Sequence, residues 1–195
     1  IQMIDSNELI QSAAVNATCS FMQNVPIDHG CRFLHTLISM AKPNCDHFTM
    51  STLAQFFGRH MSSSDIKSLP DVITMVNEII VALVKFQEYW FENEIRRPET
   101  IADIAQCLLH ITSYHYDRLL QNHSDNSRLV YTILLKCFDD HTITKKGDTG
   151  LIIRRACIQS CLNYVHCIDS DQLLNLIRLI TSEAASNRGF TFRLS

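Results

Sequence analysis

Glycine scarcity is the feature that most constrains this chain, because only five glycines occur in 195 residues. Average usage of about 7% would give more than twice that number. Phosphate-binding loops, dinucleotide-binding motifs and hairpin-rich β folds need glycine wherever φ must be positive or the backbone must approach a ligand closely. The composition therefore disfavours those folds and favours helices.

Apolar residues recur at helical spacing along almost the whole chain, and no run of strand length alternates with a period of two. This pattern predicts an all-α protein of about eight helices. Asp28 is the expected N-cap of the second helix, and Asp169 with Gln172 resembles a capping box before the eighth. The expected helical ranges are 6–23, 28–42, 49–61, 71–97, 98–121, 127–139, 149–166 and 170–185.

The longest expected helix, 71–97, has an unusually broad apolar surface. Pro98 should end it and begin the next helix, because proline removes a backbone donor and is favoured at a first helical position. A helix with apolar residues over more than one face is covered on two sides. Its main stripe comprises Val72, Val76, Ile79, Leu83, Phe86 and Trp90, and Ile73, Ile80, Val84, Phe91 and Ile95 widen it.

Short loops between helices of similar length predict antiparallel neighbours, and the last two helix pairs begin near Pro98 and Thr149. In helix length, pairing and period, residues 70–185 resemble the HEAT and armadillo class of helical repeats. That resemblance implies a short α-solenoid of stacked helix pairs, which offers an extended surface to a partner. We expect one domain over 1–195, with N-terminal helices in 1–69, the stack in 70–185 and a tail in 186–195.

Composition and the ends of the chain bear on location. No apolar run approaches the ~20 residues of a membrane span. The chain opens IQMIDSNELI, without an initiator methionine or a signal-peptide pattern, so we expect a segment of a larger protein. Eight cysteines lie mostly within apolar helical runs, which favours free thiols in the cytoplasm or nucleus. The glycosylation patterns at Asn16 and Asn122 are short enough to occur by chance.

The motifs that could carry chemistry are incomplete. Asp148-Thr149-Gly150 matches the aspartic-protease tripeptide, but it occurs once and precedes an apolar helix rather than following a strand. Cys31 with His35, and Cys157 with Cys161, stand four residues apart on a helix face, which supplies half of a metal site each. We expect these cysteines to be packing residues, and predict neither metal, cofactor nor enzymatic activity.

Two groups of residues are candidate partner surfaces. One is a polar and aromatic cluster near the end of the fifth helix, and the other is a set of basic pairs in the C-terminal quarter, where residues 141–195 hold seven basic and four acidic residues. The basic pairs should lie solvated at one end of the stack. The candidate residues are Tyr114, Tyr116, Arg118, Lys145, Lys146, Arg154 and Arg155.

These patterns favour a non-catalytic scaffold domain of a larger intracellular protein. The apolar breadth of helix 71–97 and the terminal helices motivate this hypothesis, because the end units of a stack need a polar cap or a partner. The expected partner is a peptide or helical segment of another protein, or a second copy of the chain. The alternative is a nucleic-acid-associated domain that uses the basic pairs. No membrane partner is expected.

Overall fold

The computed structural model describes residues 6–61, 72–95, 97–122, 147–163 and 170–185. The fold is all-α: the described residues form seven helices and no β-strand. The expected helix at 127–139 lies outside these residues, as do Asp169 and the tail at 186–195. The helices are α1 (Ser6–Asn24), α2 (Ile27–Met40), α3 (His47–His60), α4 (Val72–Glu92), α5 (Pro98–Asn122), α8 (Gly147–Asn163) and α9 (Ser170–Ala185).

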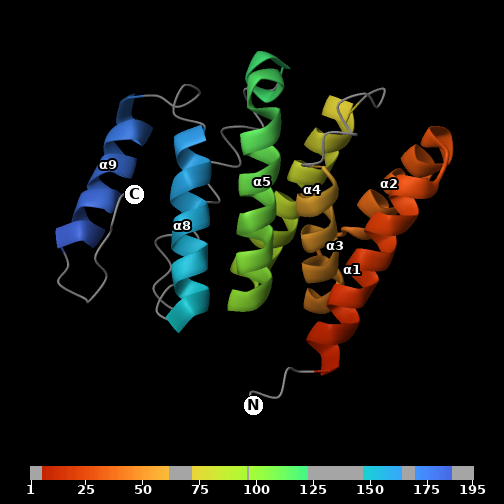
Figure 1. Cartoon of the computed structure of the whole chain (residues 1–195). Helices are drawn as coiled ribbons and strands as arrows, with labels where there is room; N and C mark the ends of the chain where they lie inside the picture. The colour runs from red at the N-terminus through yellow and green to blue at the C-terminus, as the bar shows by residue number, and fades with distance from the viewer. Residues whose placement is uncertain (1–5, 62–71, 96, 123–146, 164–169, 186–195) are drawn as a thin grey trace.

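Four of the described helices, α1, α3, α5 and α8, lie side by side in one row. In this row α3 packs against both α1 and α5, and α5 packs against α8, while α4 packs against α5 and α2 from a second layer. Figure 1 shows α8, α5, α3 and α1 in succession across the molecule. The helices α1 and α3 therefore belong to the same row as α5 and α8.

The core is centred on α4, as its sequence pattern predicts. Each member of its main stripe is at most 6% exposed, and Ile80 and Val84 are buried as well. Among the other residues expected to widen that stripe, Ile73 and Phe91 are partly buried, and Ile95, at 38%, is exposed. The broad apolar surface of α4 is therefore interior, and this helix offers no apolar face to a partner. That part of the motivation for a scaffold is wrong.

The starts of the second and third helices differ from the expected ones. The second helix begins at Ile27 with Pro26 in the N-cap position, so Asp28 lies in the first turn instead of capping it. The third helix begins at His47, not near residue 49, because the Asp46 side chain accepts a hydrogen bond from Thr49 N at 2.9 Å. The Thr49 hydroxyl also donates to Asp46, and these bonds lower the pKa of that carboxyl.

The α4 helix ends at Glu92, five residues earlier than Pro98 alone would require. Glu94 adopts a left-handed conformation with φ of 56°, and Ile95 N then donates to Trp90 O at 2.8 Å. Together with the Glu94 N to Phe91 O bond, this is a Schellman motif. Such a motif usually has glycine at the left-handed position, so the sequence carried no signal for it.

A bend in α5 connects that helix to the end of α3. His115 has non-helical φ and ψ of −106° and 15°, and its buried ring donates from Nε2 to Met61 O at 2.7 Å. Met61 is the C-cap of α3, so the histidine satisfies a carbonyl group at that helix end. The bond fixes the register of α3 against α5, whose facing sides form the groove described below.

Candidate functional site

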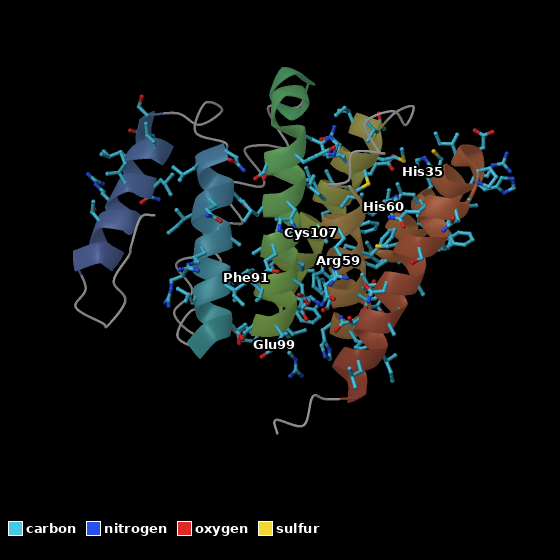
Figure 2. All side chains as sticks on the ribbon, viewed as in Figure 1. His35, Arg59, His60, Phe91, Glu99 and Cys107 are labelled. Atoms are coloured by element: carbon cyan, nitrogen blue, oxygen red, sulfur yellow. The ribbon has the colours of Figure 1, made fainter. Side chains whose placement is uncertain are left out.

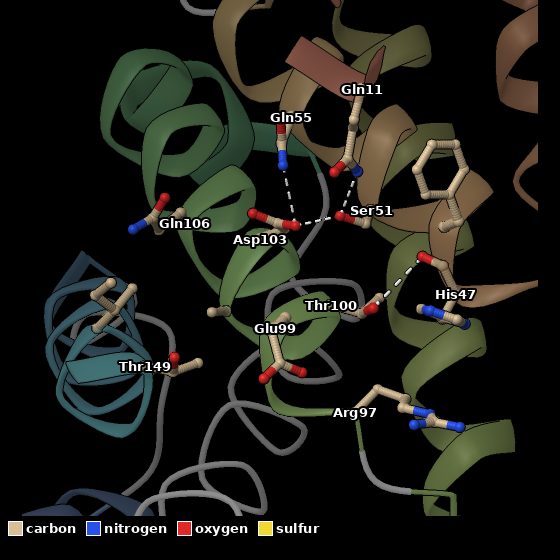
Figure 3. Close-up of a pocket in the computed structure, with 13 residues that line it drawn as sticks. Gln11, His47, Ser51, Gln55, Arg97, Glu99, Thr100, Asp103, Gln106 and Thr149 are labelled. Atoms are coloured by element: carbon tan, nitrogen blue, oxygen red, sulfur yellow. Dashed lines mark hydrogen bonds between the residues drawn. The ribbon is translucent and has the colours of Figure 1, made fainter. Parts of the chain in front are cut away.

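A groove follows the seam between α3 and α5. Residues 47, 48, 51 and 55 recur at helical spacing on α3, and residues 99, 103 and 106 recur likewise on α5. Because the two helices pack side by side, these rows face each other across a groove of about 540 Å³, shown in Figure 3. The groove is also lined by Gln11 from α1, by Arg97, Thr100 and Ala102, and by Thr149 and Ile152 from α8.

A hydrogen-bond network joins three helices at the floor of this groove. Gln11 of α1 donates from Nε2 to Ser51 Oγ at 2.7 Å, and Ser51 in turn donates to Asp103 Oδ2. Gln55 donates to the same carboxylate oxygen at 3.2 Å. Figure 3 shows the amide and hydroxyl groups converging on Asp103. A charged acceptor that receives two bonds holds α3 against α5 more firmly than neutral bonds would.

The walls of the groove combine an open polar group with exposed apolar side chains. Gln106 is exposed, and its carboxamide has no hydrogen-bond partner among the described residues, so it is free to donate and accept. Phe48 and Ile152 are 39% and 38% exposed on α3 and α8. Apolar side chains beside unused hydrogen-bonding groups are the usual composition of a surface that binds another protein.

A second hollow of about 300 Å³ continues the groove, sharing Gln55, Asp103 and Gln106 with it. Here α3 and α5 approach each other closely, since a Cβ added at Gly58 would lie 3.2 Å from Cys107 Cα. Figure 2 labels Cys107 and Arg59 in this part of the molecule. The remaining lining residues are Ala54 and His110.

The second hollow is lined by one thiol, Cys107, and by the guanidinium of Arg59. Burial raises the pKa of the Cys107 thiol, and the nearby Asp103 carboxylate raises it further. Cys107 therefore stays a protonated, inert thiol near neutral pH. Arg59 is exposed and donates to Asn16 Oδ1 at 2.8 Å, which ties α3 to α1.

The predicted site residues whose side chains the structure describes, Tyr114, Arg154 and Arg155, do not line this groove. Tyr114 is half-buried and contacts the His115 ring edge-on, with 5.0 Å between the ring centroids. The side chains of Tyr116 and Arg118, and all of Lys145 and Lys146, lie outside the described residues. The described members of the predicted set, Tyr114, Arg154 and Arg155, therefore do not establish one common surface.

The expectation of a solvated Arg154 is wrong, because this side chain is 7% exposed while Arg155 is exposed. The cause is helical geometry: position 154 lies four residues after Gly150 and four before Ile158, both of which are buried on the side of α8 that packs on the protein. The basic patch therefore keeps only Arg155 as a solvated member among the described residues.

Within the described residues no three histidine, cysteine or acidic side chains group as a metal site would require. Cys31 is partly buried, whereas His35 is directed to Glu78 of α4 at 3.5 Å from its carboxylate. The described helices include none with the length and apolarity of a membrane span.

The groove residues Ser51, Gln55, Asp103 and Gln106 were not predicted. The sequence indicated only that these residues recur at helical spacing on the polar sides of two helices. It did not indicate that those two sides face each other in the fold.

Comparisons with protein-family models, curated proteins and solved structures found no match for this chain.

Proposed function

We propose that this chain is a non-catalytic scaffold domain that binds a segment of another protein in the groove between α3 and α5. The observation that carries the proposal is the pairing of exposed apolar side chains, Phe48 and Ile152, with the unused carboxamide of Gln106 around one groove. Exposed apolar side chains that border a groove together with polar groups are a common composition of protein-binding sites. Four cysteines of the described residues, Cys19, Cys31, Cys45 and Cys107, are free thiols, which supports an intracellular setting for this scaffold.

The groove has dimensions that suit a short segment. From Glu99 to His110 the α5 wall extends about 16 Å at 1.5 Å per residue. An extended segment of about five residues covers the same length. Carboxamides such as Gln55 and Gln106 can donate to a carbonyl and accept from an N–H, so they suit the exposed backbone of such a segment.

We assign Ser51 a structural role, although a serine beside an aspartate resembles part of a catalytic arrangement. Its hydroxyl accepts from Gln11 and donates to Asp103, so both hydrogen-bonding roles are used within the chain. The residue is also only 7% exposed. A nucleophile needs an accessible oxygen and a base that removes its proton, and the network instead fixes the spacing of the helices.

Affinity capture from cells, with the full-length protein and quantitative mass spectrometry, tests the proposal. The groove variant combines Phe48→Ala, Gln106→Ala and Ile152→Ala. The matched control is Tyr89→Ala, which removes an aromatic side chain 37% exposed on α4, away from the groove. We expect the groove variant to lose at least one partner that the wild type and the control retain, with similar thermal unfolding of all three. Recovery of the same partners by all three would refute the groove as the binding site.

A further inference from the structure

An apolar seam on α1 lies exposed at the end of the helix row. Ile10, Ala14, Ala17 and Phe21 are spaced four, three and four residues apart, which places them on one narrow stripe of the helix. Ile10 is 61% exposed, Phe21 is 50% exposed, and both alanines are exposed. A different side of α1, carrying Gln11 and Val15, is buried towards α3. Figure 1 shows α1 at the edge of the row.

The stretch of α1 that carries this seam has no charged side chain of its own, and Arg59 of α3 donates to Asn16 on another side of the helix. Residues 9–27 contain no aspartate, glutamate, lysine or arginine. By contrast, the solvent-exposed side of α4 carries charged residues, Glu78 and Lys85. Solvated helix faces usually bear charges, whereas the centres of protein interfaces are depleted of them. The α1 seam therefore has the composition of an interface.

The seam is complementary to itself. In an antiparallel pair of α1 helices centred between Val15 and Asn16, Ile10 lies opposite Phe21 of the second copy, and Ala14 lies opposite Ala17. Alternating spacings of four and three residues are those of helices that pack at a small crossing angle. The alanines at the centre allow the helix axes to approach to about 8 Å, and the larger side chains at both ends then close the contact.

We propose that a second copy of this chain packs on the α1 seam, antiparallel and related by a two-fold axis. A two-fold contact requires one patch that matches itself, and the order large, small, small, large meets that requirement. Phe21 already has one edge-on aromatic neighbour, Phe33 of α2, at 5.2 Å between ring centroids. This neighbour holds the ring in place for the second copy. The proposal is independent of the groove between α3 and α5.

Sedimentation equilibrium of the purified chain between about 1 and 200 µM tests the proposed two-fold contact through the α1 seam. We expect the weight-average mass of wild type to rise with concentration from 22.3 kDa towards twice that value. Ala17→Glu places a charge in the seam and should keep the chain monomeric over the whole range. Gln23→Glu is the control, because it adds the same charge at an exposed position on another side of α1. A monomeric wild type, or an Ala17→Glu variant that dimerises like wild type, would overturn the proposal.

Cross-linking tests the register. Chains with Ala14→Cys and chains with Ala17→Cys are oxidised separately and as a mixture, with the unmodified chain as the background for native cysteines. The antiparallel register predicts more disulfide-linked dimer in the mixture than in either chain alone, because position 14 opposes position 17. Preferential linkage of Ala14→Cys to itself would indicate a parallel pair and would contradict the antiparallel arrangement.

Discussion

Gln87 provides a sharp test of the packing around α4. Its side chain is 1% exposed, and neither atom of its carboxamide has a hydrogen-bond partner among the described residues. Leaving a buried polar group unsatisfied costs about 1–3 kcal/mol. Methionine has a similar length and volume without that cost, and it adapts to irregular spaces. Gln87→Met should therefore stabilise the fold by about 1–2 kcal/mol.

Thermal unfolding followed by circular dichroism measures this effect. For a domain of this size, each kcal/mol moves the midpoint by about 2–4 °C, so we expect a rise of about 2–8 °C. Gln11→Met is the matched control, because Gln11 is also buried but donates to Ser51 at 2.7 Å. That change should lower the midpoint. A lower midpoint for Gln87→Met as well would show that its carboxamide is hydrogen-bonded in the folded chain, and would refute the reasoning.

Three further substitutions or reactions test other parts of the structure. Leu83→Asp should unfold the chain, because Leu83 is fully buried and an unpaired carboxylate there costs several kcal/mol; a cooperative unfolding transition at the wild-type midpoint would contradict this. Asp46→Ala should lower stability by about 1 kcal/mol at pH 7 in urea denaturation. Because the folded pKa of Asp46 is lowered, its contribution is present above the unfolded pKa and is lost as the pH falls through the folded value, so the difference from wild type should shrink in acid. Cys107 should resist iodoacetamide at pH 8 in the folded chain and react after unfolding, as peptide mass spectrometry would show.

The helices were largely predictable because their signals are local. Apolar spacing and the proline at position 98 placed α1 and the start of α5 correctly. The ends that were missed depend on single contacts that spacing does not encode. Asp46 caps α3 through its own carboxylate, and the left-handed Glu94 ends α4 where a sequence rule would look for glycine or asparagine.

The groove was not predictable because its parts are distant in sequence. Ser51 and Asp103, which bond at its floor, are separated by 52 residues. Alternate helices pack together in this fold, so the facing sides of α3 and α5 are separated by all of α4. Arg154 shows the converse error: charge suggested a solvated side chain, but its position on α8 places it on the buried side.

The two proposed surfaces meet at α1, and their combination has a measurable consequence. Gln11 lines the groove, whereas its neighbour Ile10 begins the exposed seam, so one helix separates a partner site from a self-association site. A two-fold pair through the seam would leave one groove open on each copy. A partner carrying two binding segments could then occupy both, and the second binding step would gain the high effective concentration of an intramolecular event. Once a segment is known, Ala17→Glu should weaken retention of its tandem form at least tenfold and leave the affinity of a single segment unchanged. Equal losses for both forms would mean that the substitution damages the groove itself.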